Sequence, residues 1–201
     1  GDELRLFTNQ FYNNLVPSAV DIYSESSDLI VKSDLMLEMS GQRIIPDEGN
    51  GWNFTALRDI NFYLQYSHNC TEVNARNRYD GVARFFRAYF YFEKVKRYGD
   101  IPWYDKALDS DDPELYKARD SREFVMQKML EDLDFAIANL PKTKNAYVLT
   151  RWTALALKSR VCLFEGTFRK YHGLEDCEKY LNACVSASET FMNESGYTLY
   201  K

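Results

Sequence analysis

One long helical pattern, predicted over residues 75–98, constrains the fold more than any other feature of the sequence. Its apolar residues point to nearly all sides of the helix, and such a helix must be buried on more than one side. The pattern ends at Gly99, a residue typical of helix C-termini, and Pro102 follows shortly afterwards. Other helices are therefore expected to pack around this segment.

Apolar residues recur at spacings of three and four in several other segments, which is the pattern of amphipathic helices. Pro17 and Pro141 end two of these patterns, and Thr150 is a candidate N-cap for another. The chain has only nine glycines and five prolines, too few for an all-β protein with many tight turns. Helices are predicted at 2–15, 54–66, from Asp120 or Ser121 to Leu140, after Thr150 and at 175–192, with 29–39 a candidate for a short one.

The last two predicted helices have the composition of a tetratricopeptide hairpin. Small residues alternate with bulky ones along both helices, and a turn containing glycine joins them, so the helices can approach closely. No full second copy of the repeat is readable, and a plain helical bundle is the alternative. The predicted fold class is all-α, with antiparallel helical hairpins of a divergent tetratricopeptide-like type in a single helical domain, 1–201. The small residues are Ala154, Ala156, Ala183 and Ala187.

Composition and charge argue against several classes of protein. A formal net charge of −5 disfavours nucleic acid as a partner, because phosphates are repelled without a local basic patch. The most apolar stretch, residues 82–92, contains Arg84 and Arg87 and is too short to span a bilayer. The four cysteines form no CxxC motif, so free thiols are expected, with Cys162 buried in a helix.

The sequence carries no recognisable motif for catalysis or cofactor binding. His68 and His172 each lack a second ligand at zinc-binding spacing, so no metal site is predicted. The acidic run at 109–114 lacks the glycine of a calcium loop and contains Pro113, which favours a solvated loop. The sequence has no nucleophile elbow, phosphate-binding loop or dinucleotide motif. We therefore expect no catalytic residue and no cofactor.

The stretch RFFRAYFYFEKVKRYGDIPWY, residues 84–104, resembles the signature of SusD/RagB proteins. In that family a helix carries an arginine, then Arg-Ala and aromatic residues, and ends in Tyr-Gly-Asp-x-Pro. Four further segments match the family in order and spacing, over nearly the whole chain. The matching residues are Arg84, Arg87, Ala88, Tyr89, Phe90, Tyr98, Gly99, Asp100 and Pro102, with Leu57 to Asn61, Arg119 to Pro141, Thr150 to Arg160, and Gly196 to Leu199.

Most of these motif residues are expected to build the scaffold. Arg84 and Arg87 lie in an aromatic helix, where an arginine pairs with carboxylates or stacks on rings more often than it contacts a ligand. Gly99 is expected at a positive φ, which favours glycine. The signature therefore predicts structure rather than a binding site.

The resemblance implies a function. SusD-like proteins are surface-exposed lipoproteins of the Gram-negative outer membrane that lie over a SusC-like TonB-dependent transporter. They capture oligosaccharides or polysaccharides for import and catalyse nothing. The resemblance also implies a lipid-bearing cysteine near the start, the sole membrane attachment, and a larger C-terminal part that supplies much of the sugar site. The printed sequence contains neither.

Two alternatives belong to other classes. A tetratricopeptide-like adaptor would hold a partner peptide in a helical groove lined by rows of Asn, Lys or Arg, which are not evident. A fragment of an α-helical toroid glycosidase would need an acid and a base across a cleft. Glu131 and Asp134 fit one helix face, but no cleft is identified.

The longest irregular stretch, residues 40–53, is where this chain is expected to contact a glycan, because loops on a rigid scaffold carry recognition. The predicted ligand-binding residues are Gln42, Arg43 and Asp47, whose polar groups can bond sugar hydroxyls. Nearby, Trp52 offers a ring that stacks on a sugar face. The other interpretation is that Trp52 packs on the helix beginning at Phe54.

Overall fold

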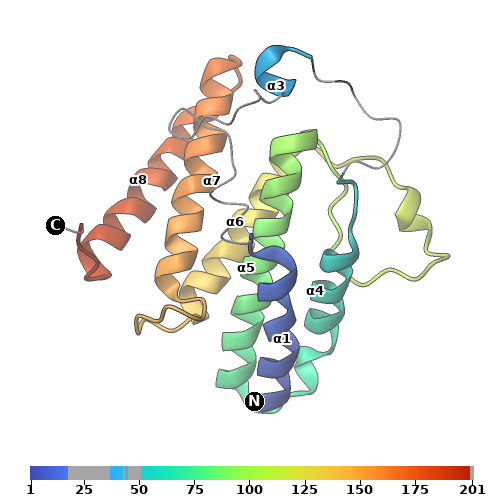
Figure 1. Ribbon diagram of the computed structural model, residues 1–201, viewed down its shortest axis with the longest axis vertical. Helices are drawn as coiled ribbons and strands as arrows, with labels where there is room; N and C mark the ends of the chain where they lie inside the picture. The colour runs from blue at the N-terminus through green and yellow to red at the C-terminus, as the bar shows by residue number, and fades with distance from the viewer. Residues whose placement is uncertain (18–36, 43, 45–50, 200–201) are drawn as a thin grey trace.

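The computed structural model describes residues 1–17, 37–42, 44 and 51–199, and within them the chain is helical (Figure 1). The one pairing of extended backbone in these residues is an antiparallel bridge between Ile101 and Asp120. The predicted all-α class is confirmed. The helices are α1 (Asp2–Leu15), α3 (Leu37–Ser40), α4 (Thr55–Tyr66), α5 (Val73–Tyr98), α6 (Arg122–Asn139), α7 (Arg151–Tyr171) and α8 (Cys177–Glu194), with 3-10 turns η1 (Ser67–Asn69) and η2 (Pro113–Tyr116).

Helix α5 lies at the centre of the arrangement in Figure 1, between α1 and α4 on one side and α6 and α7 on the other. Its rings are buried on several sides, as the all-round apolar pattern predicted: Phe86 contacts Phe11 of α1, and Phe92 contacts Phe164 of α7. Burying one such side chain contributes about 1.5–3 kcal/mol. The core is therefore organised around α5.

Gly99 ends α5 as predicted, at φ 70° and ψ −111°. Its N–H donates to the carbonyl of Val95 at 3.0 Å, which closes the last turn. A Cβ at this position would meet no atom within 4 Å, so the requirement for glycine is conformational rather than steric.

A buried ion pair joins α5 to α6. The guanidinium of Arg87 donates from Nε and Nη2 to the two carboxylate oxygens of Asp132, at 2.6 and 2.7 Å. Burial opposes the charge on Arg87, but the hydrogen bonds and the charge of Asp132 outweigh it and raise the arginine pKa. Arg84 lies 4.1 Å from the ring centroid of Phe135 and 3.9 Å from Asp132. The scaffold role predicted for both arginines is confirmed.

Helices α7 and α8 form an antiparallel hairpin whose close approach depends on a glycine. A Cβ added to Gly166 would lie 2.7 Å from the side chain of Leu181 on α8. Ala154 and Ala187 are buried, as the tetratricopeptide-like pattern predicted, whereas Ala156 is exposed and lies outside the contact. Thr150 caps α7 through its hydroxyl, which accepts from the Thr153 N–H at 3.4 Å.

A second buried charged group ties α6 to this hairpin. Glu165 on α7 is fully buried and accepts from Arg122 of α6 and from Arg169 of its own helix, each at 2.8 Å. Arg169 also pairs with Glu123, which accepts a hydrogen bond from the Tyr180 hydroxyl at 3.1 Å. The charges of this part of the chain are therefore used inside the scaffold.

All four cysteines are free, as expected. Cys162 is buried, and its burial raises the pKa of the thiol to about 12. In the part of the chain that the structure describes, no helix is long and apolar enough to cross a membrane. No group of three or more potential metal ligands occurs in the same residues.

Candidate functional site

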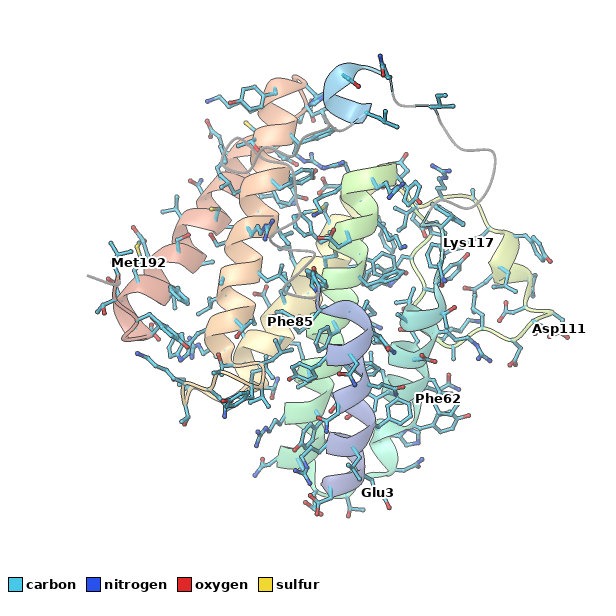
Figure 2. The ribbon with its side chains drawn as sticks, viewed as in Figure 1. Glu3, Phe62, Phe85, Asp111, Lys117 and Met192 are labelled. Carbon is cyan, nitrogen blue, oxygen red and sulfur yellow. The ribbon has the colours of Figure 1, made fainter. Side chains whose placement is uncertain are left out.

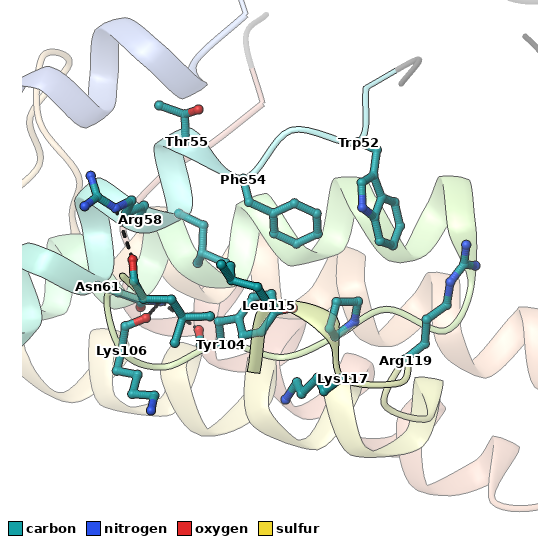
Figure 3. Close-up of a pocket in the computed structure, with 13 residues that line it drawn as sticks. Trp52, Phe54, Thr55, Arg58, Asn61, Tyr104, Lys106, Leu115, Lys117 and Arg119 are labelled. Carbon is teal, nitrogen blue, oxygen red and sulfur yellow. Dashed lines mark hydrogen bonds between the residues drawn. The ribbon is translucent and has the colours of Figure 1, made fainter. Parts of the chain in front are cut away.

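A pocket of about 520 Å³ opens between the start of α4 and the connection from α5 to α6 (Figure 3). The connection, residues 101–120, is called the pocket loop below. Aromatic rings and long basic side chains from the two walls face this space. The lining residues are Trp52, Phe54, Thr55, Leu57, Arg58, Asn61, Pro102, Tyr104, Lys106, Leu108, Leu115, Lys117 and Arg119.

The α4 wall carries two rings that are fixed by other rings. Trp52 contacts Phe54 and Tyr98 edge to face, at centroid distances of 5.2 and 4.9 Å. Phe54 in turn contacts Phe90 of α5 at 5.7 Å and Tyr104 of the pocket loop at 5.9 Å. The rings therefore keep their orientation without a ligand, which lowers the entropic cost of binding one.

The pocket loop is fastened where it leaves and rejoins the helices. The Ile101 N–H donates to the carbonyl of Asp120 at 3.2 Å, and the Trp103 N–H donates to the Asp120 carboxylate at 2.7 Å. The Arg122 N–H donates to the Asp100 carboxylate at 2.8 Å, which holds the start of α6 against the end of α5. The two ends of the loop are thus held together.

Asn61, at the end of the Leu57–Asn61 segment, connects the pocket loop to the buried ion pair. Its amide nitrogen donates to the carbonyls of Tyr104 at 2.8 Å and Lys106 at 3.2 Å. Its amide oxygen accepts from Arg87 at 3.2 Å. Because Asn61 is buried and fully used in this way, it positions the loop and is not free to bind a ligand.

The charged groups on the pocket are all basic: no carboxylate occurs among the described residues that line it. Lys106 pairs with Glu114 at 3.1 Å, a hydrogen bond that raises its pKa. Lys117 pairs with Asp120 at 2.9 Å.

The two arginines of the pocket have no ion pair among the described residues. Arg58 donates from Nε to the Leu108 carbonyl at 3.4 Å. Arg119 lies over the ring of Trp52, 4.9 Å from its centroid.

The pocket has the chemistry of a binding site for polar rings. Trp52 is 37% exposed and presents a flat aromatic face, on which a planar or apolar ligand surface could stack. The guanidinium groups of Arg58 and Arg119 are exposed fixed donors for hydroxyl or acidic oxygens. Glycoside hydrolysis would need two carboxylic side chains facing each other across a cleft, and the lining just described holds none.

None of the ligand-binding residues predicted from the sequence is found in the described lining of this pocket. One lies elsewhere in the described chain, and two lie outside the described residues. Gln42 is exposed, just after α3, and does not line the pocket. Arg43 and Asp47 lie outside the described residues, as does most of the predicted 29–39 segment. All three binding residues stay predictions. Trp52 fits both interpretations given for it, because it packs on Phe54 and also faces the pocket.

The sequence analysis did not predict the basic side chains that line the pocket. The sequence predicts a solvated loop here, and this holds for the acidic tip of the pocket loop. Asp109 and Asp111 are exposed, and Asp111 lies at the outer end in Figure 2. Lys117 lies nearer the helices in the same view. The available signal was the change within the loop from acidic residues to a basic pair, Lys117 and Arg119, spaced two apart.

Comparisons with known proteins identify relatives over most of the described chain. The model of the SusD-like family, described as "Starch-binding associating with outer membrane", matches residues 21–151. A SusD-like protein of Formosa agariphila is 29% identical over 87 residues, which are 43% of this chain and 17% of that protein.

Solved structures share the fold. A SusD-like protein from Bacteroides fragilis is 28% identical, with a TM-score of 0.60 over 73% of this chain and 26% of the other. A laminarin-binding SusD-like protein is 18% identical, with a TM-score of 0.60 over 73% of this chain and 31% of the other. The chain thus spans less than a third of the length of each of these relatives.

Proposed function

We propose a function from one premise: the chain belongs to the SusD-like family. Members of this family are carbohydrate-binding proteins of the outer membrane. The proposal is that this chain forms the N-terminal helical part of a surface lipoprotein that captures oligosaccharides. The captured glycan would pass to a SusC-like TonB-dependent transporter, with no bond made or broken by this protein.

The observation that carries the proposal is the pocket with its ordered rings. Trp52, Phe54 and Tyr104 come from two separate segments and are fixed by edge-to-face contacts before any ligand binds. Burial raises the pKa of the Tyr104 hydroxyl, so this group stays neutral and donates to the Glu114 carbonyl at 3.2 Å. These three ordered rings lie beside the basic side chains of the pocket. Together they match a sugar, which presents apolar C–H faces and hydroxyl groups.

Two kinds of contact are proposed for the glycan. One sugar ring stacks on the exposed part of Trp52, while Arg58 and Arg119 donate to oxygens of the same oligosaccharide. Gln42, which is exposed, supplies a further hydrogen bond to the same chain of sugars, as do Arg43 and Asp47. The single-domain organisation of 1–201 also stays a proposal.

Calorimetric titration of the protein with a panel of oligosaccharides tests this function. Trp52→Ala is expected to weaken binding by about tenfold or more, because stacking of one ring on an aromatic side chain contributes on the order of 1–3 kcal/mol. Tyr147→Ala is the matched control, since Tyr147 is 90% exposed and distant from the pocket lining. Equal affinity of both variants for a glycan that the parent binds would move the site away from the pocket.

The predicted segment is tested separately. Gln42→Ala combined with Arg43→Ala is expected to weaken the same titration while leaving the helical circular dichroism spectrum unchanged. Unchanged affinity in the double variant would exclude these two residues as contacts and would leave the pocket as the site.

A further inference from the structure

We infer that the pocket selects a negatively charged sugar, one that carries a carboxylate or a sulfate ester, over a neutral one. The inference rests on the proposed function, because it assumes that the ligand is a glycan. It concerns a property the family does not fix, which is the charge of the ligand.

The first argument is the contrast between the pocket and the rest of the chain. The sequence holds 30 acidic and 25 basic residues, for a net charge of −5. The described lining of the pocket nevertheless carries four basic side chains and no acidic one. A concave surface lined by one sign of charge concentrates the field and raises the local concentration of ligands of opposite charge.

The second argument separates the two lysines from the two arginines. Lys106 and Lys117 are largely compensated, because carboxylates of the pocket loop lie within 3.1 Å and 2.9 Å of their ammonium groups. Arg58 and Arg119 have no carboxylate partner among the described residues. The uncompensated positive charge on the pocket is therefore that of the two guanidinium groups.

Three other arginines show how the scaffold uses this side chain. Arg87, Arg122 and Arg169 each pair with a carboxylate inside the scaffold. An arginine that a fold retains for stability is normally satisfied by such a partner. Arg58 and Arg119 face a cavity instead, which is the placement expected of groups that receive an acidic ligand.

The third argument is preorganisation. The guanidinium of Arg119 is held over the Trp52 ring, and Nε of Arg58 is held by the Leu108 carbonyl. The remaining N–H groups of each arginine stay available as a planar fork, which matches the paired oxygens of a carboxylate or a sulfate. Figure 3 shows Arg58 and Arg119 toward opposite ends of the pocket, so the anionic groups of two sugar residues have separate binding points.

Calorimetry with three matched tetrasaccharides tests the inference: one of uronic acids, one sulfated and one neutral. At low salt, at least one charged ligand is expected to bind about tenfold more tightly than the neutral one, because each of the two exposed arginines contributes up to about fivefold. The advantage should shrink at high salt, where exposed charges are screened. The uronic-acid and sulfated arms show which anionic group the pocket accepts.

The variant Arg58→Gln with Arg119→Gln should weaken binding of the charged ligand far more than binding of the neutral one, so that the ratio of the two affinities falls to about one. Arg160→Gln, an exposed arginine on α7, is the control and should keep it. If the double variant loses its helical spectrum, Arg119→Gln alone carries the test, since that side chain is exposed.

The failures of the two proposals differ. Glycans that bind without regard to charge, or a preference that persists in the arginine variants, overturn the selection for anionic sugars and leave glycan capture standing. If the three ligands fail to bind, and neutral polysaccharides also fail to bind, the proposal of glycan capture by this chain is itself overturned.

Discussion

Two contacts between an arginine and a tryptophan ring lie in different regions of the molecule and can be compared. In the interior, Arg87 lies 5.2 Å from the ring centroid of Trp103, and at the pocket Arg119 lies 4.9 Å from that of Trp52. The two pairs are alike in residue type and separation. They differ in the rest of the contacts: Arg87 is 6% exposed and bonded to Asp132, whereas Arg119 is exposed and has no ion pair among the described residues.

The difference shows that residue type does not decide between structure and recognition. A buried guanidinium must be paired within the protein itself, because leaving it unpaired costs about 3–5 kcal/mol of folding free energy. This cost is comparable to that of removing a whole side chain from the core. An exposed guanidinium keeps its donors for another molecule. The four tests below compare three positions in the scaffold with the pocket arginine by their effect on stability, from the largest to the smallest.

Removal of the partner of Arg87 is expected to have the largest effect. Asp132→Ala should lower the free energy of unfolding by about 3–5 kcal/mol, because it leaves a buried, unpaired guanidinium. Urea denaturation followed by circular dichroism measures the change. Asp134→Ala, on the same helix and 58% exposed, should cost less than about 1 kcal/mol. Equal effects of the two variants would contradict the structural role assigned to Asp132.

The helix contact at Gly166 comes next. Gly166→Ala should destabilise by about 1–3 kcal/mol, because the new methyl group would overlap Leu181. Gly81→Ala is the matched control: its Cβ would lie 3.4 Å from Leu140, an ordinary contact, and alanine favours a helix. A thermal melt of both variants measures this, and a stabilised Gly166→Ala would show that the hairpin is looser than described.

The end of α5 gives a smaller effect. Gly99→Val should cost on the order of 1 kcal/mol or more, because valine is strained at a φ of 70° even with open space around it. Denaturation and glycan titration should be run on the same samples. Wild-type stability combined with lost binding would reverse the assignment and make the turn part of the ligand site.

The pocket arginine should affect stability least. Arg119→Gln is expected to change the free energy of unfolding by no more than about 0.5 kcal/mol, as an exposed substitution does. A clear loss of stability would place Arg119 with Arg87 among the structural arginines, and the comparison between the two regions would fail.

Much of the scaffold could be predicted from the sequence, because local signals coincide with tertiary ones there. The predicted helix 2–15 matches α1 in both bounds, and Gly99 and Thr150 act as the end and the cap that their residue types indicate. The aromatic helix around Arg87 also indicates that this arginine pairs with a carboxylate or stacks on a ring, and it does both. These features depend on spacing within one segment or on a short motif, which a single sequence displays.

The pocket could not be predicted in the same way. Its walls come from segments about 50 residues apart, such as Arg58 and Leu108, and no local pattern announces their contact. The pocket loop carries enough acidic residues to indicate a solvated loop, while the residues that face inward are scattered between them. Burial in a loop has no period, so only the three-dimensional contact reveals which side chains share a cavity.

The antiparallel bridge between Ile101 and Asp120 determines which part of the pocket loop can change without disturbing the helices. Because both ends of the pocket loop are clamped to each other and to the helices, alterations at its outer tip are isolated from the core. Doubling the length of a flexible loop costs only about 0.6 kcal/mol of closure entropy. The tip around Asp111 can therefore change in sequence and length while the helical frame that presents it stays the same.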